Sequence, residues 1–333
     1  MHLVTGATGH IGNVLIRQLL ARGEKVRVLV RRHASLAPLQ GLEVELFYGN
    51  LLEPGTLARA LEGVERVYHL AARISLRGGA DPETERVNLE GTRLLLAAAR
   101  RAAVQRFVYA SSIYALRIPA EGVVDESLPF DPEHARGVYD RSKAAASLEV
   151  QAAAAEGLDA VIVCPTAVIG PYDFRPSEAG RGLLYNIQPG IKFYVNGAYD
   201  FVDVRDVAQG FLLAAEKGRR GETYILGGNR LTVREVAETI WEVAGGWHVG
   251  LHLPDWIADA AAGIWPMVSD TPMMTSYSLA AVRSNSYISH AKAERELGYA
   301  PRPAQQAIRD ATRWFLWKRE AIAQADLAWG TVI

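Results

Sequence analysis

The glycine-rich segment Thr5 to Gly12 constrains this chain more than any other feature. A short apolar run precedes the segment, and apolar residues at helical spacing follow it. A strand, a glycine turn and a helix in this order present backbone N–H groups and the positive end of the helix to a phosphate. Gly6 can form the turn, Gly9 lets the phosphate approach the backbone, and Gly12 lets the helix lie close to the sheet. A second apolar strand, Lys25 to Val30, follows. The segment therefore predicts a dinucleotide-binding site.

Strands and helices alternate through the first half of the chain with short connections, which is typical of a parallel sheet covered on both faces. We predict an α/β fold, a Rossmann-type doubly wound parallel sheet with a smaller, interleaved C-terminal lobe. Residues 1–170 are expected to form the dinucleotide-binding domain, to which residues 200–228 return. Residues 171–199 and 229–333 are expected to form a substrate-binding lobe that closes over it. The predicted strands are Leu3–Val4, Lys25–Val30, Val44–Tyr48, Arg66–Leu70, Arg106–Ala110, Asp159–Cys164, Phe201–Val204 and Glu222–Leu226.

Composition excludes several other classes of protein. The 333 residues are 49% hydrophobic and 22% charged, as in an ordinary globular protein with a sizeable core. A net charge of -1 gives no reason to expect nucleic acid or an anionic membrane as a partner. The single cysteine, Cys164, excludes an intramolecular disulfide and lies in an apolar strand, so we expect an inert buried thiol. No apolar run could span a bilayer, and the first strand begins too near Met1 for a signal peptide. We expect a cytoplasmic protein with no membrane partner.

A tyrosine and a lysine supply the candidate chemistry. Tyr139 and Lys143 are four residues apart at the start of a predicted helix, so they share one face. Ser111 and Ser112 follow the fifth strand, and ligands of open parallel sheets bind beyond the carboxyl ends of the strands. Carbonyl reduction needs a proton at oxygen, and a phenol with a pKa near ~10 needs a neighbouring cation to act at neutral pH. We predict no metal site, because the histidines are scattered and there is no cysteine-rich motif.

Together these motifs resemble those of the extended short-chain dehydrogenases/reductases, in the NAD-dependent epimerase/dehydratase superfamily. The resemblance rests on the glycine segment, the serine pair and Tyr139-x-x-x-Lys143, and covers the chain to about residue 230. Further matching segments are Asn88 to Thr92, Gly170-Pro171 and Phe201 to Ala208. The resemblance implies that Ser112, Tyr139, Lys143 and Asn88 are catalytic, with Ser112 rather than Ser111 orienting the carbonyl. It implies cofactor contacts at Thr5, Gly6, Thr8, Gly9, His10, Ile11, Gly12, Arg31, Arg32, Asn50, Leu51, Leu70, Ala71, Ala72, Tyr139, Lys143, Pro165 and Thr166.

The end of the second strand indicates which cofactor binds. Enzymes that prefer NAD place an acidic residue there to bind the ribose 2′-hydroxyl. This chain has Arg31 and Arg32, which can pair with a 2′-phosphate. We therefore expect NADP(H), with NAD(H) as the alternative. Asn50 stands where the family usually has an aspartate that contacts adenine.

The substrate is the least constrained part of the prediction. Nucleotide-sugar enzymes of this family carry an arginine that binds the diphosphate, and here that position is Tyr199. The chain thus resembles the branch of dihydroflavonol 4-reductases, cinnamoyl-CoA reductases and 3β-hydroxysteroid dehydrogenases. We expect an NADP(H)-dependent oxidoreductase that interconverts an aldehyde or ketone and its alcohol. A nucleotide-sugar epimerase or dehydratase and a non-catalytic dinucleotide sensor are the alternatives. The residues expected to line an apolar pocket are Phe174, Leu183, Leu184, Tyr185, Phe193, Trp256, Trp265 and Met267.

A few further predictions concern packing and assembly. His69, at a strand end, is interpreted as structural rather than catalytic, and Trp314, Phe315 and Trp317 as packing residues of the last helix. Core packing and a substrate pocket or lid are both open for Met273, Met274 and Tyr277. The helices Val87–Ala102 and Tyr139–Glu156 are rich in alanine. Since the family often pairs through these two helices, we expect a homodimer.

Overall fold

The computed structural model describes residues 1–74, 81–268, 275–284 and 286–330, without the side chains of residues 265–268 and 320–330. Met273 and Met274 lie outside the described residues, and the side chains of Trp265 and Met267 are not described. The chain forms two compact units, and each is described by itself. Unit 1 consists of Met1–Thr166, Val204–Gly228 and Asn285–Pro301, and unit 2 of Ala167–Asp203, Asn229–Ser284 and Arg302–Ile333.

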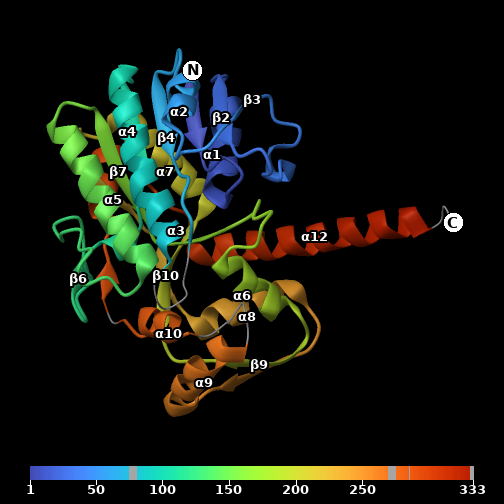
Figure 1. Ribbon diagram of the computed structural model, residues 1–333. Helices are drawn as coiled ribbons and strands as arrows, with labels where there is room; N and C mark the ends of the chain where they lie inside the picture. Colours follow the sequence, from blue (N-terminus) through green and yellow to red (C-terminus); the bar gives the residue numbers. More distant parts are fainter. Residues whose placement is uncertain (75–80, 269–274, 285, 331–333) are drawn as a thin grey trace. The chain divides into compact units, whose positions relative to one another are not determined.

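A seven-stranded sheet organises unit 1 (Figure 1). Its order is β11-β7-β5-β4-β1-β2-β3, and all of its pairings are parallel. The strands are β1 (His2–Thr5), β2 (Val26–Val30), β3 (Glu45–Tyr48), β4 (Arg66–His69), β5 (Arg106–Ala110), β7 (Ala160–Pro165) and β11 (Thr223–Leu226). The central strands are buried along nearly their whole length, as expected where helices cover both faces of a parallel sheet. The predicted Rossmann-type doubly wound sheet is confirmed.

Helices cover both faces of this sheet. α1 (His10–Ala21) packs against α7 (Val204–Lys217) on one face, and α2 (Pro54–Ala60), α4 (Gly91–Arg101) and α5 (Val138–Ala155) adjoin one another on the other (Figure 1). A short helix, α3 (Pro82–Glu85), and one wide turn, η2 (Arg86–Glu90), lead into α4. Asp81 caps the N-terminus of α3, because its side chain accepts from the Thr84 N–H at 3.1 Å. The remaining short elements are η1 (Ala37–Leu39), η3 (Ile113–Ala115) and α11 (Ala291–Leu297).

Residues 285–301 belong to unit 1, although we predicted them to lie in the C-terminal lobe. A pairing between two strands of two residues each attaches this segment to unit 1. β14 (Tyr287–Ile288) pairs in parallel with β6 (Val123–Val124), more than 160 residues earlier in the chain. The Ser286 hydroxyl also donates to the Pro119 carbonyl at 2.6 Å. Neither contact has a local signal in the sequence.

Unit 2 is built from short strands and five helices among its described residues. β10 (Ala198–Asp203) pairs in parallel with β8 (Ala167–Ile169) and antiparallel with β12 (Asn229–Thr232). A separate parallel pair joins β9 (Gly190–Tyr194) and β13 (His248–His252). The helices are α6 (Glu178–Ile187), α8 (Val233–Ala244), α9 (Asp255–Val268), α10 (Ser276–Val282) and α12 (Ala304–Gly330). Thr232 and Glu235 form a capping box at the start of α8, and α12 continues to Gly330.

Candidate cofactor and active site

The glycine segment forms the expected turn between β1 and α1. Gly6 has φ +71°, and a Cβ atom there would lie 2.6 Å from the Ala71 nitrogen. A Cβ on Gly12 would lie 2.2 Å from the Gly6 carbonyl oxygen, so only glycine fits either position. The Gly9 N–H donates to that same oxygen at 2.9 Å, and no side chain caps the first turn of α1. Thr8, His10 and Ile11 are partly exposed around this turn. The backbone thus forms a cradle open to a phosphate group.

The ends of β2 and β3 carry the remaining residues predicted to select the cofactor. Arg31 and Arg32 directly follow β2, and both side chains are exposed. Asn50 follows β3, and its Oδ1 accepts from the Leu52 N–H at 3.1 Å. The Oδ1 atom of Asn50 is used in this local turn. The Nδ2 amide group is therefore the part of the side chain that can hydrogen-bond to adenine. Leu51 is buried in the core of unit 1.

The Ser112 and Tyr139 side chains meet near the carboxyl end of β5. Ser112 is buried, and its hydroxyl accepts from the Tyr114 N–H at 3.2 Å, which fixes it at the start of η3. Tyr139 lies in the first turn of α5, and the neighbouring Ser112 side chain acts to lower the pKa of its phenol. Burial, reinforced by the nearby Asp140 carboxylate, raises the pKa of Tyr139 well above its usual value. The phenol is therefore protonated at neutral pH in this structure, ready to donate its proton.

Lys143 is buried one helical turn after Tyr139, with 3% of its surface exposed. Its Nζ donates to the Ala110 carbonyl oxygen at the end of β5 and lies 4.5 Å from the centre of the Tyr109 ring. Burial lowers the pKa of Lys143 to about 7. The expectation that this ammonium lowers the pKa of Tyr139 stays a prediction for the cofactor-bound enzyme, since burial dominates here.

Asn88, the fourth predicted catalytic residue, lies within the wide turn η2. Its side chain accepts from the Arg73 N–H at 2.8 Å and donates to the Arg73 carbonyl at 3.0 Å. It also donates to the Ser142 hydroxyl at 2.9 Å, and that hydroxyl donates to the Tyr139 carbonyl at 2.7 Å. Asn88 thus holds the backbone of Tyr139 and of the segment after β4. Ser142 was not predicted, because no motif distinguishes it from other serines on a helix.

The end of β7 offers a further test of whether these residues suit a dinucleotide. Pro165 closes the strand, and Thr166 follows it with only 9% of its surface exposed. Among the described residues the Thr166 Oγ1 atom is buried without a hydrogen-bond partner. Because buried hydroxyls are nearly always paired, this atom is suited to meet a bound polar group. With the glycine cradle and the exposed arginines, the residues present fit a nicotinamide dinucleotide.

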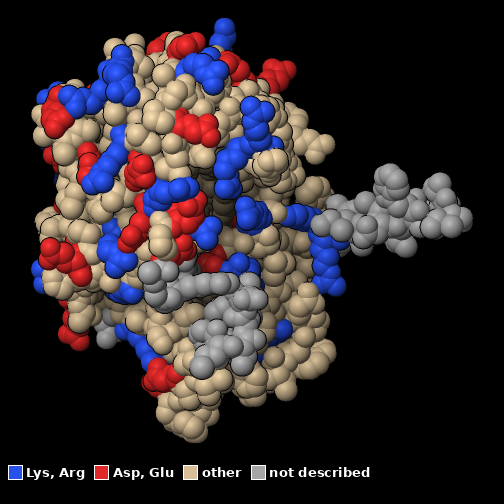
Figure 2. Space-filling model, viewed as in Figure 1, with Lys and Arg blue, Asp and Glu red and all other residues tan. Residues whose placement is uncertain are grey.

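Among the side chains that the structure describes, the predicted apolar residues of unit 2 do not gather into one pocket. Leu183 lies in the core of the unit, and Phe174 packs edge-to-face on Trp314 at 5.4 Å. Phe193 and Trp256 are exposed, by 54% and 73%. The alternation of β9 explains this, because Lys192 takes the buried face and turns Phe193 outward. In Figure 2 the part of unit 2 formed by β9 and α9 shows almost only uncharged side chains.

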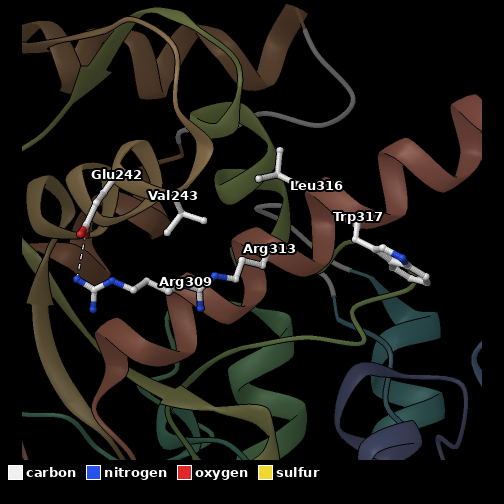
Figure 3. Close-up of a pocket in the computed structure, with 6 residues that line it drawn as sticks. All are labelled: Glu242, Val243, Arg309, Arg313, Leu316 and Trp317. Atoms are coloured by element: carbon white, nitrogen blue, oxygen red, sulfur yellow. Dashed lines mark hydrogen bonds and ion pairs between the residues drawn. The ribbon is translucent and has the colours of Figure 1, made fainter.

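The last helix also differs from the expectation in one residue. Phe315 is buried and Trp314 packs beside it, as predicted. Trp317 is 62% exposed and borders an open groove between α8 and α12 (Figure 3). The other residues that line this groove are Glu242, Val243, Arg309, Arg313 and Leu316. Arg309 pairs with Glu242 at 2.9 Å and Arg313 with Asp310 at 3.2 Å, so the cations of the groove are already neutralised.

No three His, Cys, Asp or Glu side chains described here gather closely enough to hold a metal ion. None of the described helices is both long enough and apolar enough to cross a membrane. Cys164 is buried as predicted, and burial raises its pKa to about 12, so the thiol is protonated at neutral pH.

The fold and this site define a dinucleotide-binding Rossmann protein. A model of the NAD dependent epimerase/dehydratase family matches residues 2–227. The chain is 40% identical over 319 residues to sterol demethylase protein B of Methylococcus capsulatus, covering 94% of this chain and 97% of that protein. It is 34% identical to a putative dihydroflavonol 4-reductase of Synechocystis sp., covering 94% of this chain and 93% of that protein. The crystal structure of gox2253 matches with TM-score 0.80 and 35% identity over 96% of this chain and 98% of that one. The chain belongs to the NAD dependent epimerase/dehydratase family, within the extended short-chain dehydrogenases/reductases.

Proposed function

We propose that this protein is an NADP(H)-dependent oxidoreductase that interconverts an aldehyde or ketone of a fairly apolar small molecule with its alcohol. The observation that carries the proposal is the joint placement of Ser112, Tyr139 and Lys143 at the carboxyl end of β5. A dinucleotide sensor has no need of a protonated phenol close to a serine hydroxyl and a buried lysine. Fold alone would not distinguish these classes.

Each side chain has a distinct role in this proposal. A bound nicotinamide supplies or accepts the hydride. The Ser112 hydroxyl hydrogen-bonds the carbonyl oxygen and orients it, and Tyr139 donates its phenolic proton to that oxygen. The high pKa of Tyr139 favours this direction, since it keeps the acid form present at neutral pH. Lys143 stabilises the phenolate that remains, and Asn88 holds the Tyr139 backbone through Ser142.

The apolar character of the substrate is supported by the charges of unit 2. A nucleotide sugar would need fixed cations for two phosphates, because a buried unpaired charge is costly. Arg181 and Arg283 already pair with carboxylates, and Lys192 is buried over the Tyr185 ring. Tyr199, at the position of the diphosphate-binding arginine, donates to the Ser278 carbonyl. The names of the relatives, a sterol demethylase and a dihydroflavonol reductase, also favour a hydrophobic substrate.

The second candidate is an NAD-dependent nucleotide-sugar epimerase or dehydratase. The family model that matches two thirds of the chain carries that description, which is the specific observation in its favour. In such an enzyme the cofactor is reduced and reoxidised within one turnover, so it undergoes no net change.

Cofactor absorbance at 340 nm tests the proposal directly. Wild-type protein is assayed with NADPH and NADH against aromatic and medium-chain aldehydes and ketones, and separately with UDP-glucose and dTDP-glucose. We expect net oxidation of NADPH by a carbonyl compound. Conversion of a nucleotide sugar without net change in absorbance would support the second candidate instead.

Tyr139→Phe is the matched variant for this assay. It removes the phenolic proton and little volume, so we expect kcat to fall by ~10²–10⁴-fold while the Kd for NADPH changes less than about threefold. Fluorescence titration of the cofactor measures the second quantity. A variant that keeps most of the wild-type kcat would refute the assignment of Tyr139 as the acid.

A further inference from the structure

His69, at the end of β4, lies between two threonine hydroxyls. Its Nδ1 atom is 2.7 Å from Thr5 Oγ1 at the end of β1, and its Nε2 atom is 3.0 Å from Thr92 Oγ1 on α4. The side chain is 1% exposed, and its ring lies 5.6 Å from that of Tyr109. Burial, with a contribution from the Lys143 charge, lowers the pKa of His69 to about 3. The imidazole is therefore neutral at physiological pH and carries one N–H group.

The neighbouring bonds determine which nitrogen carries that hydrogen. The Thr92 hydroxyl donates its only proton to the Asn88 carbonyl oxygen at 2.6 Å. Its oxygen can therefore only accept from His69, which makes Nε2 the protonated nitrogen. Nδ1 must then accept, so the Thr5 hydroxyl donates to it. The oxygen of Thr5 in turn accepts from the Ala71 N–H at 3.2 Å.

This chain of hydrogen bonds continues to the candidate acid. From Asn88, the side-chain amide donates to Ser142, and Ser142 donates to the carbonyl oxygen of Tyr139. At the other end of the path, Thr5 and Ala71 lie beside Gly6 of the glycine cradle, where an added Cβ would lie 2.6 Å from the Ala71 nitrogen. Every donor along this path has one acceptor, from the cofactor cradle to the backbone of Tyr139.

The wide turn η2 departs from regular α-helical geometry. The helix alone therefore does not set the distance from Asn88 to the strands β1 and β4. Within η2 the Gly91 N–H donates to the Arg86 carbonyl, five residues back. The ordinary helical ladder is interrupted there, and the Thr92 hydroxyl supplies a partner for the Asn88 carbonyl. The position of Asn88 relative to β1 and β4 thus depends on the bonds that Thr92 and His69 make across the sheet.

We propose that His69, held as the neutral Nε2–H tautomer by Thr5 and Thr92, is a positioning residue that fixes the distance between the cofactor cradle and the Asn88–Ser142–Tyr139 chain. The role in turnover rests on the function proposed above, whereas the tautomer does not. A displacement near 1 Å of a reacting group can lower turnover by about 10²-fold, so a fixed spacing has catalytic value.

The tautomer is tested by NMR of the full-length protein labelled with ¹⁵N at histidine, with His69→Gln used to assign the signal. We expect the His69 ring to show protonated Nε2 and unprotonated Nδ1 without titrating between about pH 5 and pH 9. A protonated Nδ1, or a ring that titrates in this range, would overturn the proposal. This measurement needs no substrate, so it stands even if the proposed reaction is wrong.

The positioning role is tested at Thr92, which is not among the residues predicted to contact cofactor or substrate. Thr92→Val keeps the shape and removes the hydroxyl, whereas Thr92→Ser keeps the hydroxyl. We expect kcat to fall by ~10–10²-fold in Thr92→Val, with the KM for NADPH within about twofold of wild type, and near-wild-type kcat in Thr92→Ser.

Urea unfolding and circular dichroism of both Thr92 variants separate positioning from folding. The proposal requires Thr92→Val to be fully folded under assay conditions while kcat is reduced. It is overturned if Thr92→Val keeps the wild-type kcat, if Thr92→Ser loses as much activity as Thr92→Val, or if the loss equals the unfolded fraction. A wild-type protein that reduces no carbonyl compound would refute the proposed function and leave the NMR result to judge the tautomer.

Discussion

At the scale of single residues, Lys143 combines a chemical role with a cost to stability. Burial lowers its pKa to about 7, whereas the unfolded chain titrates near ~10.5. Between these values the unfolded state binds more protons, so the free energy of unfolding rises with pH. The free-energy cost of burying the Lys143 charge is therefore fully present below about pH 7 and is lost as the pH approaches 10.5.

Replacing Lys143 by methionine should remove that penalty. We expect Lys143→Met to raise the free energy of unfolding by ~1–3 kcal/mol at pH 7, and the gain to shrink towards about pH 9.5. This range allows for loss of the bond to Ala110 and of the contact with the Tyr109 ring. Turnover should be abolished in the same variant.

Urea unfolding at the two pH values measures this effect, and Lys25→Met is the control. Lys25 is exposed just before β2, so its replacement should change stability little and equally at both pH values. If Lys143→Met is less stable than wild type at pH 7, or if its gain does not vary with pH, the buried-charge argument fails.

At the scale of elements, the turn after β2 should select the cofactor. Arg31 and Arg32 are exposed there and can form charge-assisted hydrogen bonds with a 2′-phosphate, each worth ~1.5–3 kcal/mol. We expect wild-type protein to prefer NADPH. Arg31→Ala and Arg32→Ala should each lower kcat/KM for NADPH by about tenfold or more and leave that for NADH nearly unchanged.

Steady-state kinetics with both cofactors decide this point. Arg59→Ala, which removes an exposed arginine on α2, is the control and should affect neither cofactor. Equal or better kcat/KM with NADH in the wild-type protein would show that the basic turn does not select NADP.

The secondary-structure elements also show which parts of the fold can be predicted from the sequence. The strands of the seven-stranded sheet were predicted within a residue or two, because each is a continuous apolar run between turn residues. β8, β9, β12 and β13 were missed, since they are three to five residues long and pair with partners distant in sequence. In β9 the usual burial of apolar and exposure of charged side chains is reversed, since Phe193 is exposed and Lys192 is buried. No local rule predicts that inversion.

Within the site, the sequence alone indicated the residue types but not their connections. The glycine spacing and Tyr139-x-x-x-Lys143 predict positions on one element each, which periodicity can supply. His69 and Thr92 meet only because β4 lies beside α4, and the wide turn η2 interrupts a helix that was predicted to be continuous. Such contacts come from register and packing between distant segments, so they become visible only in the folded chain.

At the scale of the whole molecule, we predict a homodimer that pairs through α4 and α5. Ion pairs between α4 and α5 join Arg93 to Glu149 at 2.6 Å and Arg100 to Glu156, the residue that caps the end of α5. Since both pairs are 56 residues apart in sequence, the two helices run parallel. Ala97 and Leu148 are exposed on this surface, and small side chains let helices from two copies approach closely.

Light scattering at micromolar concentration measures the mass, for which we expect twice that of one chain. Leu148→Glu places a charge in the centre of the predicted interface, so it should shift the protein to the monomer without unfolding it. Leu46→Glu is the matched control, because Leu46 is similarly exposed on β3 (39% against 41%) and should leave the dimer intact. A wild-type protein with the mass of one chain would exclude the dimer. A dimer that survives Leu148→Glu would place the interface elsewhere, because a charge buried without a partner at the centre of a helix–helix contact is strongly unfavourable.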